Sequence, residues 1–202
     1  MRLLELFAGT GSMGRAFEAQ GWEVISLDVT PPATIITNIM DWDFRRYPPG
    51  HFDFIWASPP CTEYSIARTK AKRPRDFETA DAIVARTLDI IEYFEPFLWL
   101  LENPATGFLK YRPIMAEIPF QDITYCRYGF RYRKLTRLWG MFPFVLRPIC
   151  TKKDPCHNVV NGRHISVAQR ENLGERHSLA QLYSIPPELC DQIAHMAQFW
   201  LE

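Results

Sequence analysis

Strand and helix patterns alternate through the first half of this chain, and that alternation limits the folds open to it. Apolar segments of strand length occupy residues 2–7, 22–27, 34–37, 52–57 and 97–101. Residues 13–20 have a helical pattern that Gly21 stops, and residues 77–94 repeat apolar side chains at intervals of three and four. Strands that alternate with helices form parallel βαβ units with helices on both sides of the sheet. We therefore expect an α/β fold with a mostly parallel, doubly wound sheet.

This regular pattern ends near residue 143. Residues 143–178 have little periodicity and several prolines and glycines, which indicates an irregular insert. A final helix is expected from Pro186, with a buried stripe formed by Leu189, Ile193, Met196, Ala197 and Trp200. Because 202 residues suit one core, we expect a core at 1–142, an insert at 143–178 and a helical segment at 179–202 that packs back on the core.

Charge is balanced over the whole chain but not along it. Lys and Arg together number 23, as do Asp and Glu, so the net charge gives no sign of a polyanionic partner. Two local clusters of cations differ from this average. They are Arg68, Lys70, Lys72, Arg73 and Arg75, and then Arg127, Arg131, Arg133, Lys134 and Arg137. A single basic run is usually a solvated loop, but two such clusters favour contact with phosphates.

The cysteine count and the hydropathy indicate the kind of cellular compartment in which the protein is found. There are five cysteines, an odd number, and we expect no secretory leader ahead of the first strand, so a reducing, cytoplasmic compartment is favoured. Cys126 and Cys190 are expected to be small core residues. We expect no membrane span, because no apolar stretch approaches the roughly 20 residues that a bilayer requires.

Two strands are followed by residues suited to chemistry. Ser58-Pro59-Pro60-Cys61 comes directly after the strand at residues 52–57, and Glu102-Asn103-Pro104 ends a later strand. A strand that ends in a rigid Pro-Pro turn presents the next side chain at the carboxyl edge of the sheet, where open α/β folds bind ligands. Cys61 is therefore placed to attack a flat ring lying in the cleft at that edge.

A glycine-rich loop, Phe7-Ala8-Gly9-Thr10-Gly11-Ser12, joins the first strand to the first helix. Such a loop lets the backbone approach a cofactor closely near the N-terminus of a helix. Asp28 closes the second strand, where an acid can accept both hydroxyls of a ribose. Together these features indicate a nucleoside cofactor, and the structural alternative is a tight turn with a helix-capping acid.

The chain resembles the cytosine-5 DNA methyltransferases in three motifs that follow the family's order and spacing. These are Phe7-Ala8-Gly9-Thr10-Gly11, Ser58-Pro59-Pro60-Cys61 and Glu102-Asn103. The resemblance covers roughly residues 1–140 and is most specific at the Pro-Pro-Cys segment. It implies a Rossmann-like fold, S-adenosylmethionine as cofactor, and transfer of a methyl group to carbon 5 of cytosine in double-stranded DNA.

The same resemblance implies roles for the matched residues. Cys61 would add to carbon 6 of cytosine, which makes carbon 5 reactive toward the methyl donor. Glu102 would hold or protonate ring nitrogen 3, Asn103 would brace the loop, and Pro59 would form part of the floor between cofactor and base. Carbon 6 is inaccessible in a stacked duplex, so the base would be rotated out while the basic segment at residues 68–75 clamps the DNA backbone.

The resemblance also implies a set of cofactor-binding residues. They lie in the glycine loop, after the second and third strands, and at the start of the Pro-Pro turn. The set is Phe7, Ala8, Gly9, Thr10, Gly11, Ser12, Asp28, Val29, Asn38, Ile39, Asp41, Ser58 and Pro59. Asn38 or Asp41 would face the adenine amino group.

The chain departs from the family's pattern in three respects. Pro104 stands where the family usually has valine, and the family's glutamine-arginine-arginine strand is not plainly present. Arg137 is the best match for a cation that contacts the base or the closed loop, with Arg133 in support. The recognition region has only about forty residues, so we expect a short target site or help from a partner.

Alternatives remain open at this point. The same reaction could act on transfer RNA, or the chain could be a catalytically silent nucleic-acid-binding member of the fold. Cys150, Cys156, His157 and His164 are chemically competent for zinc but lack a close Cys-x-x-Cys pair, and we assign no metal site from the sequence. The compact chain is consistent with a solitary phage, viral or bacterial modification enzyme, with a monomer favoured.

Overall fold

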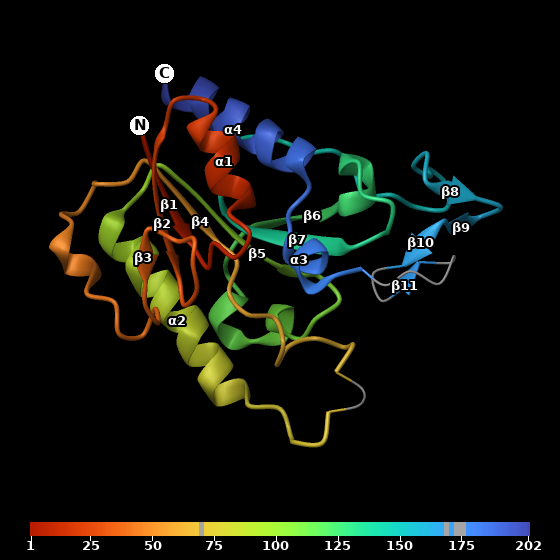
Figure 1. Cartoon of the computed structure of the whole chain (residues 1–202), viewed down its shortest axis with the longest axis horizontal. Coiled ribbons are helices and arrows are strands. Elements are labelled where there is room, and N and C mark those ends of the chain that lie inside the picture. Colours follow the sequence, from red (N-terminus) through yellow and green to blue (C-terminus); the bar gives the residue numbers. More distant parts are fainter. Residues whose placement is uncertain (69–70, 168–169, 172–176) are drawn as a thin grey trace.

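The computed structural model describes residues 1–68, 71–167, 170–171 and 177–202, so Lys70 of the first basic cluster lies outside the described residues. Within them, seven strands form one sheet in the order β3-β2-β1-β4-β5-β7-β6 (Figure 1). The strands are β1 (Arg2–Leu6), β2 (Glu23–Asp28), β3 (Ile35–Ile36), β4 (Phe54–Ala57), β5 (Leu98–Pro104), β6 (Phe120–Thr124) and β7 (Leu135–Met141).

The sheet is parallel except at β7. Strands β3, β2, β1, β4 and β5 pair in parallel, and β7 runs antiparallel to both β5 and β6. In the centre, Leu4 of β1 is in register with Ile25 of β2 and Ile55 of β4. β4 is buried along its whole length, which explains its unbroken apolar sequence. The structure confirms the predicted mostly parallel α/β fold.

The order of the strands reverses at β1. β2 and β3 lie to one side of it, whereas β4 and β5 lie to the other. In doubly wound sheets, ligands bind beyond the carboxyl ends of the strands at such a switch point. Leu6 at the end of β1 pairs with Ala57 at the end of β4. The glycine loop and the Pro-Pro-Cys turn therefore leave the sheet side by side.

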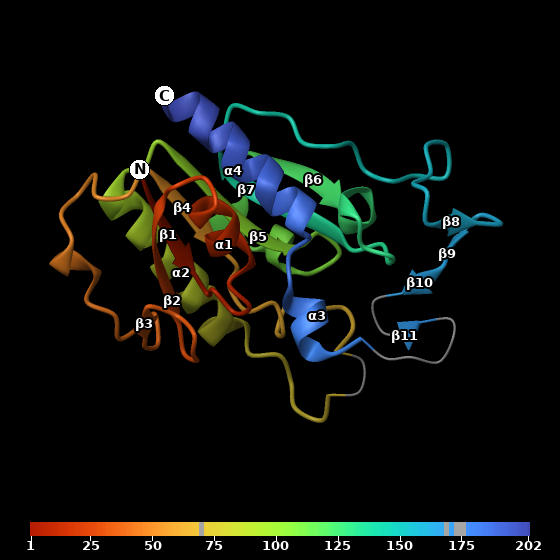
Figure 2. The ribbon, with the colours of Figure 1, turned by 45° about the horizontal axis from the view of Figure 1, so that its top comes forward.

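Helices cover both faces of the sheet, as Figures 1 and 2 show. α1 (Ser12–Glu18) and α4 (Pro187–Leu201) pack together on one face, and α2 (Phe77–Phe94) covers the other. Trp200, expected in the buried stripe of the last helix, is instead 52% exposed. The stripe continues from Ala197 to Leu201, which packs against the core, because that spacing of four stays on the inner face.

The start and end of α2 agree with its predicted range of residues 77–94. Asp76 precedes the helix, and its side chain accepts a hydrogen bond from the Thr79 backbone N–H at 3.0 Å. This contact is an N-cap, which satisfies one of the unpaired amides of the first turn. Glu95 ends the helix in a left-handed conformation with φ of 47°. α2 therefore begins soon after the Pro-Pro-Cys turn and supports that side of the sheet edge.

Beyond β7 the chain leaves the sheet and forms short antiparallel pairs before it returns (Figure 2). These are β8 (Val159–Val160) with β9 (Arg163–His164), and β10 (Ser166–Val167) with β11 (Arg170–Glu171). α3 (Leu179–Tyr183) then leads into α4. The boundaries proposed at residues 142 and 178 stay a prediction.

Four 3₁₀ helices complete the described secondary structure: η1 (Phe44–Arg46), η2 (Leu109–Tyr111), η3 (Pro113–Met115) and η4 (Tyr125–Tyr128). η4 follows β6 directly and packs near α4. Among the described residues, none of the helices combines the length and the hydrophobicity that a bilayer crossing requires.

Candidate active site

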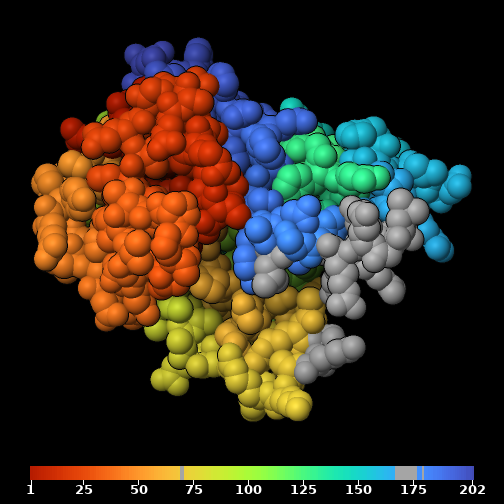
Figure 3. All heavy atoms as spheres, viewed as in Figure 1, coloured from red at the N-terminus to blue at the C-terminus, as the bar shows by residue number. Residues whose placement is uncertain are grey.

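A cavity of about 350 Å³ lies at the carboxyl edge of the sheet, where β1 and β4 end. Its walls come from the glycine loop, the ends of β2 and β5, the turn after β4, and the residues at and after the end of α3. In Figure 3, the α3 region (blue) lies at the surface between the N-terminal elements (red) and the segment after β4 (gold). Both ends of the chain therefore contribute to one ligand-sized cavity.

The glycine loop turns sharply between β1 and α1. Phe7, Gly9 and Gly11 all have left-handed backbone conformations, with φ of 60°, 52° and 66°. Glycine adopts this conformation freely, whereas at Phe7 it costs about 1–2 kcal/mol. Phe7 and Gly9 line the cavity, so the unusual backbone lies where it would touch a ligand.

Asp28 connects the end of β2 to the glycine loop. Its Oδ2 accepts a hydrogen bond from the Gly9 backbone N–H at 2.9 Å. Its Oδ1 accepts from the Thr30 backbone N–H at 3.0 Å and from the Thr30 hydroxyl at 2.9 Å. The carboxylate also faces the cavity. Since a carboxylate offers about four acceptor positions, Asp28 can fix the loop and still receive a ligand hydroxyl.

Glu5 is a buried carboxylate in the cavity wall, with only 2% of its surface exposed. Burial raises its pKa to about 7, although backbone N–H groups of Gly14 and Met13 donate hydrogen bonds that act in the opposite direction. An added Cβ at Gly14 would lie 2.6 Å from Glu5 Oε2, so a larger residue there would force the carboxylate to shift. The cavity thus contains an acid whose charge changes near neutral pH and which a cationic ligand would stabilise as the carboxylate.

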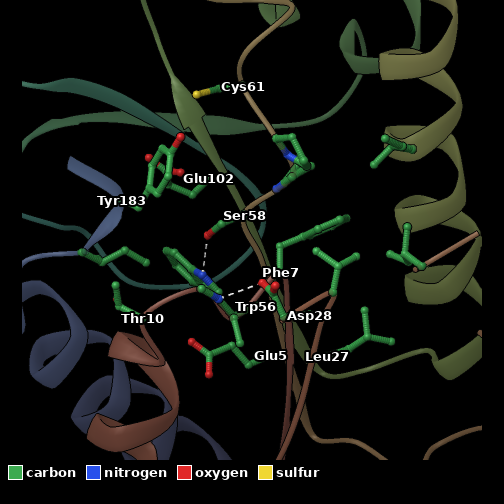
Figure 4. Close-up of a pocket in the computed structure, with 18 of the residues that line it drawn as sticks. Glu5, Phe7, Thr10, Leu27, Asp28, Trp56, Ser58, Cys61, Glu102 and Tyr183 are labelled. Carbon is green, nitrogen blue, oxygen red and sulfur yellow. Dashed lines mark hydrogen bonds between the residues drawn. The ribbon is translucent and has the colours of Figure 1, made fainter. Parts of the chain in front are cut away.

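The Pro-Pro-Cys turn is held by three contacts. The Ser58 backbone N–H donates to the last carbonyl of β1 at 3.2 Å, which continues the pairing of β1 with β4. The Trp56 indole N–H donates to Ser58 Oγ at 2.8 Å (Figure 4). Asn103 Nδ2 donates to the Pro59 carbonyl at 3.0 Å, the contact expected of a residue that braces this turn. Cys61 is thereby fixed at the sheet edge, partly exposed and with a free thiol.

Glu102 extends from β5 into the same cavity, and Figure 4 shows it on the side toward Cys61, away from Glu5. It is 7% exposed. Its Oε1 accepts a hydrogen bond from the Tyr125 hydroxyl at 3.0 Å and lies 3.5 Å from Lys134 Nζ. The same Nζ lies 4.6 Å from the centre of the Tyr125 ring. A buried carboxylate requires such partners, because burying an unpaired charge is costly.

The surroundings of Cys61 oppose its ionisation. Burial raises the pKa of the thiol and the charge of Glu102 raises it further, while Lys134 acts in the opposite direction. The thiol, the carboxylate and the ammonium group therefore influence one another. Neutralising Glu102 by protonation or by contact with a substrate would favour the thiolate of Cys61.

Most residues expected to bind a cofactor line this cavity. They are Phe7, Ala8, Gly9, Thr10, Ser12, Asp28, Val29, Asn38, Ile39, Ser58 and Pro59, together with Cys61 and Glu102. Two others do not. Gly11 precedes α1 at its N-cap position, and Asp41 is exposed beside a separate hollow. Of the two candidates for an adenine amino group, only Asn38 therefore lies at the cavity.

The structure does not support the placement expected for the two arginines. Arg137 forms hydrogen bonds of 2.7 and 2.9 Å with Asp122, its cross-strand neighbour in β6, and its guanidinium lies over the Phe120 ring. Arg133 donates from Nε to the Cys150 carbonyl at 3.2 Å. Neither lines the cavity, because partners on neighbouring elements hold them elsewhere. The basic residue of this segment that does line it is Lys134.

Several cavity residues were not identified from the sequence. They include Glu5, Trp56, Ile83, Lys134, Tyr183 and Ile185. Glu5 has a local signal, namely an acid within an apolar strand just before a glycine loop. Tyr183 and Ile185 have none, since only the return of the C-terminal segment brings them to the cavity.

The fold and the cavity define a class of α/β enzymes in which a thiol and a carboxylate face a ligand site beside a glycine loop. A family model described as C-5 cytosine-specific DNA methylase matches residues 1–110. A probable DNA (cytosine-5)-methyltransferase of Frog virus 3 (isolate Goorha) is 31% identical over 209 residues, covering 94% of this chain and 96% of that protein. The chain belongs to the C-5 cytosine-specific DNA methylase family, and its class of enzyme is DNA (cytosine-5-)-methyltransferase.

Among solved structures, the chain is similar to the Entamoeba histolytica methyltransferase EhMeth. The TM-score is 0.52 at 15% identity, over 73% of this chain and 55% of that one. The chain thus spans about half the length of this structural neighbour, and the likeness supports the fold alone. The comparisons confirm the resemblance, the Rossmann-like methyltransferase fold and the enzyme class that the motifs predicted.

Proposed function

We propose that this enzyme transfers a methyl group from S-adenosylmethionine to carbon 5 of cytosine in double-stranded DNA, through a transient bond between Cys61 Sγ and carbon 6. The observation that carries the proposal is that Cys61 and Glu102 face one cavity together with the glycine loop and Asp28. A nucleophile, a group for ring nitrogen 3 and a cofactor-sized site therefore adjoin one another.

The cavity fits the chemistry of S-adenosylmethionine, which supplies an electrophilic methyl group when bound. Asp28 would accept a hydrogen bond from a ribose hydroxyl, and Asn38 would face the adenine. Phe7 and Ile39 provide apolar surface for the ring. Glu5 would face the cationic part of the cofactor, which suits a buried carboxylate whose hydrogen bonds come from the backbone of Gly14 and Met13.

In the proposed reaction, the Cys61 thiolate forms a bond to carbon 6, and the electron pair of the 5,6 double bond makes carbon 5 nucleophilic. Glu102 stabilises the charge that develops on the ring by protonating or holding nitrogen 3. Lys134 favours the thiolate, because its positive charge lowers the pKa that burial of Cys61 raises. After methylation, loss of the carbon 5 proton to water re-forms the double bond and releases the thiolate.

The target base must leave the DNA stack to reach Cys61. The first basic cluster lies directly after the Pro-Pro-Cys turn and supports contact with the DNA backbone. Arg68 and Arg73 both form ion pairs with Glu63, which holds this segment next to the cavity, while Lys72 is exposed. We propose that phosphates compete for these arginines when DNA binds.

The setting that we propose is viral or phage, with the enzyme acting as a monomer in the cytoplasm of the host cell. The relative from Frog virus 3 supports a viral setting. The short insert at residues 143–178 would contact the target site, which is expected to be correspondingly short.

Methyl transfer from labelled S-adenosylmethionine to duplex DNA and to transfer RNA tests the proposal. We expect label in DNA only, and bisulfite sequencing of DNA from expressing cells should locate it at carbon 5 of cytosine within a short site. Cys61→Ala should lose all label while remaining folded. Label in transfer RNA alone would favour the RNA alternative, and no label in either substrate would favour a silent binding member of the fold.

A further inference from the structure

Three thiols and an imidazole converge outside the active-site cavity. Sγ of Cys126, Cys150 and Cys156 and a ring nitrogen of His164 all lie within 4.8 Å of one another. Nε2 of His164 lies 3.6 Å from Cys150 Sγ and 3.5 Å from Cys156 Sγ. All three cysteines are buried, with at most 6% of their surface exposed.

These distances suit a tetrahedral metal. With Zn–S near 2.3 Å and Zn–N near 2.0 Å, ligand atoms around zinc lie about 3.5–3.8 Å apart. The distances from His164 Nε2 to the sulfurs of Cys150 and Cys156, 3.6 and 3.5 Å, fall in that range. Three cysteines and one histidine are also one of the common ligand sets of structural zinc.

Backbone contacts already hold the ligands in place. The Cys156 backbone N–H donates to Cys150 Sγ at 3.2 Å, and such a bond stabilises a thiolate. The Cys150 backbone N–H donates to Thr124 Oγ1 at 2.8 Å. Arg133 Nε donates to the Cys150 carbonyl, which explains why this arginine points away from the active site. The cluster therefore has the outer hydrogen bonds that usually orient metal ligands.

The ligands come from two parts of the fold. Cys126 belongs to η4, which follows β6 of the main sheet, whereas the other three lie in the insert. His164 is positioned by the β8–β9 hairpin, whose turn residues Asn161 and Gly162 both have left-handed conformations. A bound ion would thus fasten the insert to the core.

We propose that Cys126, Cys150, Cys156 and His164 bind one structural zinc ion that anchors the insert to the catalytic core. Binding would displace the thiol protons and exchange them for the metal. His157, which the sequence offered as a ligand, is exposed and outside the cluster, and Cys126 takes its place. This proposal does not depend on the reaction proposed above.

Ordinary hydrophobic packing accounts poorly for the cluster. The three cysteines form a buried group of their own, with Val159 against it, apart from the two large cores. A disulfide would join only two of the three thiols, and all five cysteines of the chain are free. A metal ion bound by all four side chains would supply a cross-link, which a short insert with little apolar core needs in order to be ordered.

Metal analysis of the purified full-length protein, loaded with zinc chloride and then dialysed, tests the proposal. We expect one zinc ion per chain in the wild type and in His157→Ala, the matched control beside a ligand. Cys150→Ser and His164→Ala should lower the zinc content by about tenfold under the same dialysis. Zinc content below one tenth per chain in folded wild type, or equal content in Cys150→Ser and wild type, would overturn the proposal.

Cobalt replacement gives a second readout on the wild type, which holds even if the variants fold poorly. Loading with cobalt chloride should produce thiolate-to-cobalt charge-transfer absorption and the intense visible bands of a tetrahedral site. His164→Cys should keep the metal and shift these bands, because it exchanges nitrogen for a fourth sulfur. A cobalt-treated wild type with only the weak bands of the hydrated ion would contradict the proposal.

Discussion

Cys61 lies between a carboxylate that disfavours its thiolate and an ammonium group that favours it. Lys134 is the cation of this set, and it also lies 3.5 Å from Glu102. Replacing it with a neutral side chain leaves burial and the charge of Glu102 unopposed, so both would raise the pKa of the thiol. Ionisation of Cys61 is therefore favoured by a lysine that the family motifs did not indicate.

We predict that Lys134→Gln moves the pH profile of Cys61 alkylation to higher pH, because the charge that lowers the pKa of the thiol is lost. The measurement is the rate of iodoacetamide modification of Cys61 against pH, followed by mass spectrometry. Lys134→Arg keeps the charge and should stay close to the wild type. Identical profiles for Lys134→Gln and the wild type would show that this charge does not act on the thiol.

We predict that the free energy of unfolding depends on the protonation of Glu5. Folding raises its pKa from an ordinary 4.5 to about 7 by burial. The protonated carboxyl group therefore contributes stability that is complete below pH 4.5 and is lost as the pH rises through about 7. In Glu5→Gln this titration is removed. The free energy of unfolding of the variant relative to the wild type should rise by up to about 3 kcal/mol over that window.

Urea titrations between pH 4.5 and pH 8, the first value being the ordinary pKa of the group, measure this difference. Glu92→Gln, at an exposed position of α2, is the control and should show no such trend. If the curves of Glu5→Gln and the wild type stay parallel across the window, then Glu5 does not titrate as its burial implies.

The sequence predicted where side chains lie when they follow or close a strand. Cys61, Glu102 and Asp28 each follow or close an apolar run, so their meeting at one sheet edge could be inferred from the βα alternation. Arg137 could not be placed in this way. Its direction is decided by Asp122, which lies opposite it on β6, and that pairing joins segments whose register no local pattern reveals.

At the scale of elements, β7 inserts between β5 and β6 and must pass close to β5. Gly140 permits this approach, because it has φ of 146° and an added Cβ would lie 2.0 Å from the Trp99 carbonyl oxygen. The contact lies in the β5–β7 ladder, where Gly140 faces Leu100. The same ladder pairs Glu102 with Leu138, so the approach of β7 helps to position the strand that carries Glu102.

We predict that Gly140→Ala lowers the free energy of unfolding by at least about 3 kcal/mol, since both strain and a backbone clash must be relieved. Gly21→Ala is the matched control: its φ is 82°, but an added Cβ meets nothing within 4 Å, so only about 1 kcal/mol of strain is expected. Chemical denaturation of the two variants makes the comparison. Equal losses would mean that the approach of β7 to β5 is not close.

The sequence predicted the parallel strands and both long helices, because each has a local periodicity. It did not predict the antiparallel placement of β7 between β5 and β6. Strand order is decided by contacts between distant segments, and β7 pairs with β5 over a long sequence separation. The exposed Trp200 is a smaller error of the same origin, since Leu201 continues the buried stripe.

At the scale of the whole molecule, the C-terminal segment completes the active-site cavity. Tyr183 and Ile185 line it, and α4 then packs on α1 next to the glycine loop. The Trp22 indole N–H donates to Gln198 Oε1 at 2.6 Å, which links the end of the chain to its start. The insert is therefore flanked along the chain by two parts of one catalytic body, and a metal that anchors it would also limit how it moves relative to that body.

In the proposed reaction, Cys61 forms a covalent bond with an extruded cytosine. Incubating the enzyme and S-adenosylmethionine with a duplex carrying 5-fluorocytosine in its target site tests this claim, because fluorine cannot leave carbon 5 and the adduct persists. We predict a denaturation-resistant complex that maps to Cys61, absent with Cys61→Ala and with unmodified cytosine. A folded wild-type enzyme that methylates DNA without forming this complex, or a complex that survives Cys61→Ala, would rule out this covalent step.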